Sequence, residues 1–557
     1  MTPRALLATL TLFTLSLAPG LAHAGGFEFA GPGTRALGRG GAFMARADDP
    51  MALGYNPAAL AFLPGYQLQL GSHLIFYDAC VNRPGGYDDS DVSGTWAFES
   101  QFGAPDSTDP TNWVNQPFSQ VCRDGLPGPS PQLVFTMHPM PGLGIGVGIL
   151  APSGVGSGHW GNDDGTIDVN GRSLPTPTRY GLVSQELLLF YPSVGIGYSP
   201  VEWLSFGVTL QWGIAVVDFV NHTSAGAGHE DPGDDVRTNL QAFDGFVPAA
   251  IFSAHIVPID QMDITLMARV SDGIDAGATL NLTTGTYGTG EVGSLRPLRT
   301  ELPGTRLQTG LPMQFGLGVR YADRTERRYR DPEEAGRVTG RIEDQMQNEV
   351  WDIELDLVYT YNGAVKDFVV TPPDGAAANL CEADGTDDPD GCISRFDAPL
   401  PGQLPLPHGW RDQFSARLGA DWNVIPGTLA LRAGSHFETS GLNSRFQIQD
   451  VLPGMRLGLH LGATFRFDMV DFSIAYAHIF QWTETVSAAD ANYRHVAATG
   501  DVGQCEAVPG DDGTAYDPGR PVTDRGCYPQ GFGNPVNAGT YAAEFNVVSA
   551  SVRLHFR

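Results

Sequence analysis

The chain has 557 residues, with 62 acidic and 33 basic side chains and a formal net charge of −29. This charge excludes a cationic surface for nucleic acid, because a polyanion would be repelled from it. Disorder along the whole chain is also excluded, since 42% of the residues are apolar and 10% are aromatic.

Residues 1–24 have the pattern of a secretory signal peptide. Arg4 precedes an apolar run over residues 5–17, and Ala22-His23-Ala24 forms an A-x-A cleavage site. The run is too short to cross a bilayer as a helix, and no later segment reaches about 18 uninterrupted apolar residues. The mature chain is therefore expected to begin at Gly25 and to reach the periplasm, the outer membrane or the exterior.

Residues 25–65 contain no convincing strand. They are rich in Gly and other small residues, so they are expected to fold back and fill the space that the following strands enclose. Asn56 and Pro57 predict a rigid turn, because Asn bonds its own backbone and Pro fixes φ. This turn either leads into the first strand or takes part in gating. Four apolar side chains either fill the segment's own core or contact an apolar ligand: Phe27, Phe29, Phe43 and Met44.

Alternation with a period of two identifies the strands. In residues 204–216 the large apolar side chains occupy one face and the small or polar ones the other, which indicates a strand. Long strands with one apolar face favour a transmembrane β-barrel over a soluble sandwich. The fold is therefore predicted to be an all-β antiparallel barrel. Fourteen such segments start near Tyr66, Pro131, Leu143, Glu186, Trp203, Phe243, Met262, Leu311, Glu349, Gly409, Thr428, Met455, Val470 and Tyr541.

The connections between these segments alternate between long and short, as in outer-membrane barrels. If both termini are periplasmic, every long connection except residues 322–348 falls outside the cell. The outer connections are acidic and rich in Pro and Gly, which predicts solvated surface loops. Residues Asp384, Asp387, Asp388 and Asp390 offer oxygen ligands for a hard cation, but their spacing matches no EF-hand loop. We predict no metal site and no cofactor.

The six cysteines fall in pairs within the outer connections. Six cysteines allow 15 pairings in principle, and an oxidising compartment permits disulfides. Membership of the same connection favours three bonds: Cys80–Cys122, Cys381–Cys392 and Cys505–Cys527. No pair forms a C-x-x-C redox motif or a zinc spacing, so the predicted role is to staple loops.

Alternation also places charged side chains on the inner face of the barrel. The acids are Asp352, Glu354 and Asp356, and the arginines are Arg417, Arg432, Arg456 and Arg466. Either one or two arginines bind a carboxylate ligand, or all of them join a network of ion pairs that also holds the N-terminal segment.

An enzyme is disfavoured. A barrel phospholipase needs a Ser and a His with a polar orienting partner. His460 and His478 lie on predicted strands, and the mature sequence contains no G-x-S-x-G motif. No catalytic residue is predicted. A passive porin is a stronger alternative, although residues 25–65 argue against an open channel. A receptor or adhesin role for the outer loops is also compatible with the sequence.

Several motifs in order resemble the FadL/TodX family of outer-membrane transporters. Asn56-Pro57-Ala58, after Asp48-Asp49, resembles the N-P-A motif of the family's hatch. Residues 143–154, LGIGVGILAPSG, resemble its third strand and loop. Residues 431–434, LRAG, followed by Ser440, resemble another strand end, and Leu311-Pro312 opens the eighth strand as in the family.

This resemblance implies a 14-stranded barrel (residues 66–557) in the outer membrane of a Gram-negative bacterium, with a hatch formed by residues 25–65. It implies passive uptake of hydrophobic compounds, by default long-chain fatty acids and alternatively aromatic or alkane hydrocarbons. Its partners would be outer-membrane lipids and the barrel-assembly machinery, which usually recognises a terminal aromatic; here the aromatic Phe556 stands one place before the last residue, Arg557. Either a lateral opening in the wall or an ordinary Gly-rich loop is formed by Pro152, Gly154, Gly156 and Gly158.

Overall fold

The computed structural model describes residues 31–84, 118–125, 127–151, 156–169, 172–224, 235–286, 295–325, 344–363, 365, 367–383, 392–450, 453–487, 490–491 and 536–556. Several predictions fall outside these residues: the signal peptide, the acidic residues of 384–390, and the residues Phe27, Phe29, Pro152, Gly154, Cys505 and Cys527.

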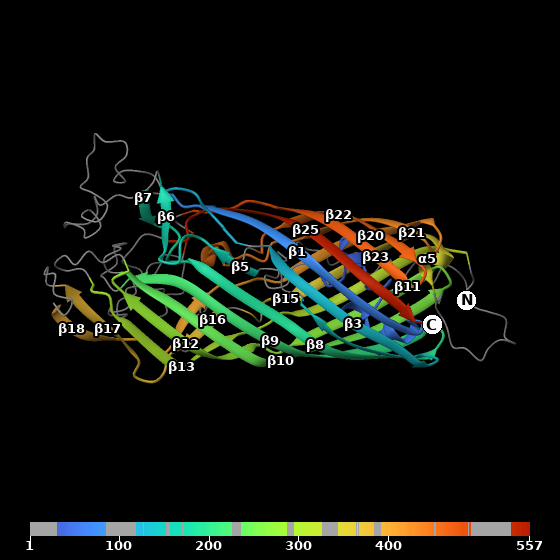
Figure 1. Cartoon of the computed structure of the whole chain (residues 1–557), viewed down its shortest axis with the longest axis horizontal. Coiled ribbons are helices and arrows are strands. Elements are labelled where there is room, and N and C mark those ends of the chain that lie inside the picture. Colours follow the sequence, from blue (N-terminus) through green and yellow to red (C-terminus); the bar gives the residue numbers. More distant parts are fainter. Residues whose placement is uncertain are drawn as a thin grey trace, which may run out of the picture.

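Antiparallel strands close into a barrel (Figure 1). Its last strand pairs with the first from Tyr66↔Phe556 to Asn82↔Thr540. All fourteen segments predicted from alternation are confirmed as wall strands. Among the described residues these strands are β1 (Tyr66–Asn82), β3 (Gly128–Met140), β4 (Leu143–Leu150), β8 (Ser184–Val201), β9 (Leu204–Ser224), β10 (Asp235–Ile259), β11 (Met262–Ser271), β14 (Met313–Arg324), β15 (Glu349–Tyr361), β20 (Gln413–Ile425), β21 (Leu429–Glu438), β22 (Arg456–Phe467), β23 (Val470–Gln481) and β25 (Gly539–Phe556).

The two faces of each wall strand differ as the alternation predicts. On β9, Leu210 and Trp212 are 58% and 54% exposed on the outside, whereas Thr209 and Gln211 are buried inside. Large exposed apolar side chains recur on the outward positions of neighbouring strands. Such a surface is stable against lipid tails and would be costly in water. The prediction of an integral β-barrel of the outer membrane is thus confirmed.

The two ends of the barrel differ. The C-terminus, the start of β1 and the short strand connections lie at one end, which we call the turn end (Figure 1). The opposite end, the collar end, carries further strands among the described residues. They are β2 (Val121–Cys122), β5 (Gly156–His159), β6 (Thr166–Val169), β7 (Arg172–Pro175), β12 (Ile274–Thr284), β13 (Arg299–Thr309), β16 (Asp367–Thr371), β17 (Ala377–Ala383), β18 (Cys392–Pro399), β19 (Leu404–Pro407) and β24 (Glu484–Val486).

The prediction of loops is wrong for these residues, because they form strands. Long wall strands extend beyond their pairing within the ring of fourteen, and the outer residues pair with these extensions. The first half of β10 pairs with β12, from Val236↔Thr284 to Phe243↔Gly277, while its second half pairs with β11. From β12 the sheet continues by antiparallel pairing to β13, then to β16 and then to β19. The collar is therefore a second tier of the barrel.

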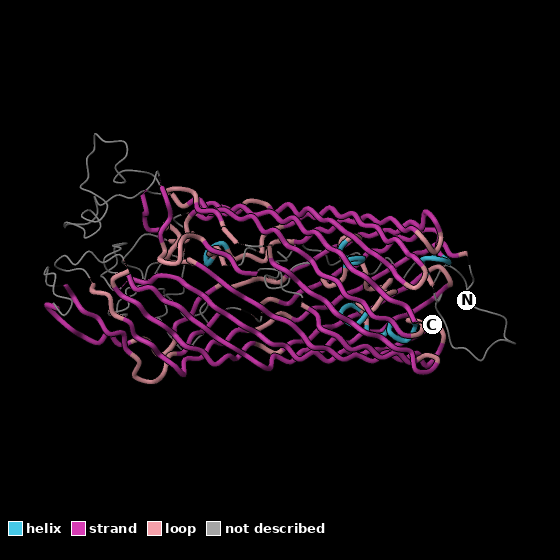
Figure 2. The backbone as a smooth tube through the Cα atoms, in the orientation of Figure 1, coloured by secondary structure: helices cyan, strands magenta, loops and turns pink. Residues whose placement is uncertain are grey.

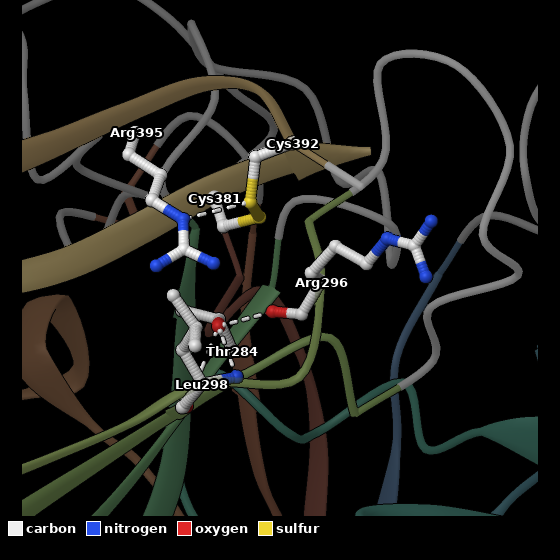
Figure 3. Close-up of a disulfide and its surroundings, with 6 residues drawn as sticks. All are labelled: Thr284, Arg296, Leu298, Cys381, Cys392 and Arg395. Carbon is white, nitrogen blue, oxygen red and sulfur yellow. Dashed lines mark hydrogen bonds between the residues drawn. A yellow bond between two sulfur atoms is a disulfide. The ribbon is translucent and has the colours of Figure 1, made fainter. Parts of the chain in front are cut away.

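Disulfides fix two parts of the collar, which confirms two of the three predicted bonds. Cys80–Cys122 joins the end of β1 to β2, and Cys381–Cys392 joins β17 to β18. Figure 3 shows the second bond beside the chain after β12. The backbone N–H of Arg296 donates to the carbonyl of Cys381 at 2.7 Å. The first staple therefore holds outer chain against a wall strand, and the second closes the β17–β18 hairpin, which forms a sheet of its own.

Helices are short and few in the described residues. Three lie in residues 31–65: α2 (Thr34–Leu37), α3 (Ala52–Tyr55) and the 3₁₀ helix η1 (Pro57–Phe62). Two more are α5 (Gln345–Asn348) and η4 (Ser444–Phe446). Among the described residues, none has the length and hydropathy to cross a membrane as a helix. Figure 2 shows helical turns inside the tube of strands.

Placing a charge on the outer face tests the membrane wall. Leu461, in the middle of β22, is 64% exposed on that face. We expect Leu461→Arg to lower the free energy of unfolding by about 2–4 kcal/mol, because the guanidinium must enter hydrocarbon. Urea unfolding in phospholipid vesicles measures this. The control Ile393→Arg changes a 56% exposed residue of the outer β18 hairpin and should leave the value nearly unchanged. Equal effects would contradict the assignment of the wall.

Candidate functional site

The lumen contains residues 31–65, which we call the luminal segment. Most of its side chains are buried, although it holds only short helices. Gly33 begins α2 with φ of 99°, a conformation that favours glycine. Pro57 opens η1, where its missing N–H costs nothing. η1 lies against β4, β8 and β9, and α2 against β22 and β23, so the segment touches well-separated parts of the wall.

A buried group of charges binds the luminal segment to the wall. The Arg39 guanidinium donates to Asp352 at 2.7 Å, Asp421 at 2.6 Å and Glu354 at 3.0 Å. Arg46 also pairs with Asp352. All five side chains are at most 1% exposed. The predicted inward acids of β15 thus meet arginines of the luminal segment.

Two carboxylates of β15, Glu354 and Asp356, accept backbone hydrogen bonds from the luminal segment. Asp356 accepts the N–H groups of Phe43 and Met44 at 2.8 and 3.0 Å. Glu354 accepts the N–H of Ala45 at 2.6 Å. A charged acceptor forms a strong bond to a buried N–H. The chain over residues 43–46 therefore has a fixed position against β15.

A second ionic group lies where the luminal segment passes β23 and β25. Arg35 donates to Asp48 at 2.8 Å within the segment. Arg553 of β25 donates to the carbonyl of Asp48 at 2.9 Å and also pairs with Asp471 of β23. Asp471 further accepts from Arg466 at 2.6 Å. The segment is thus attached to the wall on both sides of the lumen.

The Asn56-Pro57-Ala58 motif forms a turn that is bonded to β10 and β11. The Asn56 amide donates to the carbonyl of Met44 at 2.8 Å and to Thr265 at 3.0 Å. The N–H of Ala58 donates to Ser253 at 2.8 Å. Asn56 is fully buried. These bonds hold the start of η1 against the wall.

Glycines on the inner face let the wall approach the luminal segment closely. A Cβ on Gly434 of β21 would lie 2.1 Å from the carbonyl carbon of Arg39. On Gly144 and Gly207 it would lie 1.8 Å from the carbonyl oxygen of Leu60 and 2.2 Å from the nitrogen of Ala58. Sequence reasoning treated these positions only as small residues. Their recurrence at inward positions, as in LGIGVGIL, was the available signal.

A cavity of about 110 Å³ lies beside the luminal segment. Its apolar lining includes Leu37, Met44, Ile251, Val358 and Ile479, and its polar lining includes Arg417, His436, Glu438 and His460. His436 Nδ1 and His460 Nε2 share a hydrogen bond of 2.7 Å. The site therefore combines an apolar surface with one cationic and imidazole-bearing wall.

The four predicted arginines have different surroundings. Arg417 lines the cavity, its Nε donates to Ser415 Oγ at 3.3 Å, and no carboxylate of the described residues forms an ion pair with it. Arg432 pairs with Asp421 at 3.3 Å, Arg456 bonds to Gln481 at 2.9 Å, and Arg466 pairs with Asp344 at 2.6 Å. Only Arg417, of these four, lies in the cavity lining.

Phe43 and Met44, two of the predicted ligand contacts, lie in different surroundings. Met44 lines the cavity. Phe43 packs edge-on against Tyr55, with ring centroids 5.6 Å apart, and is fully buried. Phe43 thus fills the core of the luminal segment.

The inner face changes from polar to apolar along single strands, which sequence reasoning missed. On β1 the inward residues are Gln67, Gln69, Gly71 and His73, followed toward the collar by Ile75, Tyr77, Ala79 and Val81. On β25 they are Arg553, Ser551 and Ser549, followed by Val547, Phe545 and Ala543. Tyr77 and Phe545 stack with centroids 4.5 Å apart. The collar half of the lumen therefore has an apolar wall, and the turn half a polar one.

Two strands pair with β8 on the same side. β4 pairs with it as far as Leu150↔Tyr191, and β5 pairs with it from Gly156↔Leu187. Residues 152–155 between the two strands lie outside the described residues. Gly158 pairs with Gln185, and a Cβ there would lie 2.3 Å from the Nε of Arg123, whose guanidinium donates to the carbonyl of Ser157 at 2.5 Å. Gly156 and Gly158 are thus part of the ladder on β8.

Among the described residues, no group of three His, Cys, Asp or Glu side chains is arranged to hold a metal ion.

Solved structures with the same architecture are known. No family model matches the sequence, and no curated protein matches it. A Pseudomonas aeruginosa FadL homologue superposes over 96% of this chain and 100% of its own, with a TM-score of 0.61 and 13% identity. The P. putida toluene transporter TodX superposes over 95% of this chain and 99% of its own, with a TM-score of 0.53 and 14% identity. The monoaromatic hydrocarbon channel CymD superposes over 95% of this chain and 99% of its own, with a TM-score of 0.51 and 14% identity.

The chain has the FadL/TodX fold. At this identity the similarity concerns the fold, and it confirms the resemblance given by the sequence motifs at that level.

Removing Arg39 tests the attachment of the luminal segment. Arg39→Ala leaves three buried carboxylates with less compensation, so we expect the free energy of unfolding to fall by about 3–5 kcal/mol. Urea unfolding in vesicles measures the loss, and ion conductance in planar bilayers reports whether the segment has loosened. The control Arg306→Ala removes an ion pair with Asp275 whose side chains are 57% and 50% exposed. It should cost about 1 kcal/mol or less. A similar loss in both variants would contradict the role of the buried group.

A single methyl group tests the close approach at β21. We expect Gly434→Ala to displace the chain at Arg39 and to destabilise the protein by about 1–3 kcal/mol, because the packed site has no room for a Cβ. The control is Gly277→Ala on β12, where a Cβ would meet no atom within 4 Å. The change in melting temperature and the protease sensitivity of residues 31–65 measure the effect. Unchanged stability of Gly434→Ala would show that the segment is not held there.

Proposed function

We propose that the protein is a passive outer-membrane channel for the uptake of hydrophobic compounds. The observation that supports this most is the apolar collar half of the lumen, which leads to a cavity with apolar lining beside the luminal segment. An apolar solute gains free energy by leaving water for such a surface. A water-filled porin would be expected to have a polar lining at this position instead. The proposal assigns no catalytic step to any residue.

The luminal segment acts as the hatch in this proposal. Residues 25–65 form the hatch and residues 66–557 the barrel with its collar. Arg39, Arg46 and the Asn56-Pro57-Ala58 turn attach the described part of the hatch to the wall. The turn end faces the periplasm, so the solute reaches the cavity from outside before it meets the hatch. This arrangement also argues against a general porin.

Long-chain fatty acids are the proposed substrate class. Arg417 supports this choice, because it lies beside apolar side chains of the cavity lining and forms no ion pair among the described residues, and a guanidinium so placed is suited to bind a ligand carboxylate. Hydrocarbons remain the second candidate, since two structures with this fold are named as a toluene transporter and a monoaromatic hydrocarbon channel. Most of the cavity lining would suit either ligand.

The stretch between β4 and β5 is the proposed exit toward the membrane. The described ladder of β4 on β8 ends at Leu150↔Tyr191, that of β5 begins at Gly156↔Leu187, and the sequence between them supports this choice. Pro152 has no N–H to donate, and Gly154, Gly156 and Gly158 tolerate bulged conformations. The solute would leave sideways through this part of the wall.

The substrate class can be tested by native mass spectrometry of the detergent-solubilised protein with a mixed panel of fatty acids, alkanes and aromatics. We expect a fatty acid to be retained. Arg417→Gln should weaken its binding about tenfold or more, because a hydrogen bond between charged groups is lost. Arg306→Gln, at the exposed pair on β13, is the matched control and should bind as the parent does.

Three results would change the proposal. Retention of neutral hydrocarbons alone, with Arg417→Gln equal to the parent, would favour the hydrocarbon channel. Binding of no lipid together with free conduction of small ions would favour a porin. Binding of proteins by the outer hairpins, without any hydrophobic ligand in the lumen, would favour a receptor or adhesin.

A further inference from the structure

The connection between β21 and β22 folds into the mouth of the barrel. We call its residues 441–450 the strap. Its base is closed by the N–H of Gly441, which donates to the carbonyl of Pro453 at 2.8 Å. Leu442, Phe446 and Ile448 are buried, at 5% exposed or less. The strap is therefore packed within the collar and is not a free surface loop.

The strap crosses the lumen to the opposite wall. Going round the barrel from β22, the strands are β23, β25, β1, β3, β4 and then β8, so β8 lies almost diametrically opposite in the 14-stranded ring of described residues. The Gln449 amide donates to the carbonyls of Thr178 and Leu182 at 2.8 and 2.7 Å, just before β8. Gln185 of β8 donates to the carbonyl of Asp450 at 2.9 Å. The end of the strap is thus bonded to the far side.

Other bonds attach the strap to the neighbouring chain. Asp450 accepts from His408 Nε2 at 2.5 Å, and both side chains are at most 4% exposed. The Tyr541 hydroxyl lies 2.8 Å from the carbonyl of Asn537 and 3.2 Å from that of Gln447, and the two carbonyls share its one proton. The Asn537 amide donates to the carbonyl of Arg445 at 3.0 Å. Aromatic rings pack around His408, with Trp410 at 4.6 Å and Phe368 at 4.9 Å between centroids.

We propose that the strap is an outer gate of the lumen, latched to the far wall by Gln449 and Asp450 and to the β19–β20 connection by His408. The strap belongs to no wall strand, so it can leave without breaking the barrel ladder. Its release breaks, among others, the bonds of Gln449 and the ion pair between Asp450 and His408, whereas release of the luminal segment breaks several buried ion pairs of Arg39 and Arg46. The cavity lining runs from the luminal segment to Glu438, three residues before the strap.

The ion pair at His408 gives the gate a dependence on pH. Burial disfavours the imidazolium, but the charge of Asp450 and the bond to it outweigh burial, and Asp367 of β16 adds to them. The pKa of His408 therefore lies above its ordinary value. A raised pKa means that the ion pair is intact at low pH and is lost as the pH rises through that pKa. The strap should consequently open more readily at alkaline pH.

Chemical labelling of the lumen tests the gate without any ligand. A single cysteine is placed in the cavity lining by Ile479→Cys, and its reaction with a membrane-impermeant maleimide added outside is timed. We expect Gln449→Ala and Asp450→Asn each to raise the rate about tenfold, because either change removes bonds that close the strap. Each rate is divided by that of an exposed cysteine, Ile393→Cys, at the same pH, because the thiolate is the reacting form and its fraction rises with pH for any thiol. This ratio should rise with pH when Asp450 is present, and in Asp450→Asn the rise of the ratio should be lost. Protein without Ile479→Cys supplies the blank.

An exposed His–Asp pair of the outer chain provides the matched control. His159 and Asp163 lie 3.7 Å apart, with side chains 46% and 88% exposed, and neither is bonded to the strap. His159→Gln with Asp163→Asn should leave the labelling rate unchanged. Heat-modifiable migration on a denaturing gel confirms that each barrel is folded. Unchanged rates in both strap variants, or an equal rise in the control, would overturn the proposal. The readout requires no ligand, so its failure differs from failure of the proposed channel function.

Discussion

The rest of the structure depends on the need to neutralise acids that face inward. β15 and β20 bring Asp352, Glu354, Asp356 and Asp421 into a lumen where hardly any water reaches them. Isolated carboxylates at such depth would cost several kcal/mol each. Arg39 and Arg46 of the luminal segment pair with Asp352, Glu354 and Asp421, and Asp356 accepts backbone N–H groups of the same segment. Wall arginines contribute as well, since Arg320 pairs with Asp352 and Arg432 with Asp421. The segment is therefore part of the stable fold, because an empty barrel would leave Glu354 and Asp356 without these partners and the other two acids with fewer.

Steric fit and charge act together on the same segment. The wall carries glycines where the backbone of the luminal segment passes, and the carboxylates lie where its N–H groups and guanidinium groups point. Gly434 shows the combination, since it faces Arg39 itself. A side chain there would separate Arg39 from its three carboxylates. Close approach thus makes the short ionic distances possible, and the ionic bonds in turn compensate for ordering a chain with little regular structure.

The sequence predicted the wall well because a period of two repeats along each strand and its signal accumulates. It also predicted which face Arg417 and Asp352 occupy, since parity decides that. It could not tell that Arg432 pairs with Asp421 while Arg417 forms no ion pair among the described residues, because the partners of an arginine depend on strand register and on residues far along the chain. The collar strands were missed for another reason. β12 reads IDAGATLNLTT and alternates buried apolar residues such as Ile274 and Leu280 with small or polar ones, so its period of two was a signal that the sequence analysis did not use.

The division of the lumen into an apolar collar half and a polar turn half affects both the strap and the luminal segment. The apolar collar and the strap keep water away from the turn half, and Coulomb attraction is stronger where water is excluded. The ion pairs of Arg39 therefore owe part of their strength to the closed state of the other end. A solute that passes the strap and fills the cavity replaces water with apolar surface, so the hatch would stay attached while the ligand is loaded. Wetting of the cavity would instead weaken the same ion pairs. In such an arrangement the polar and apolar halves of the lumen together favour a hydrophobic ligand over water and ions, without any energy source beyond the solute's own transfer from water.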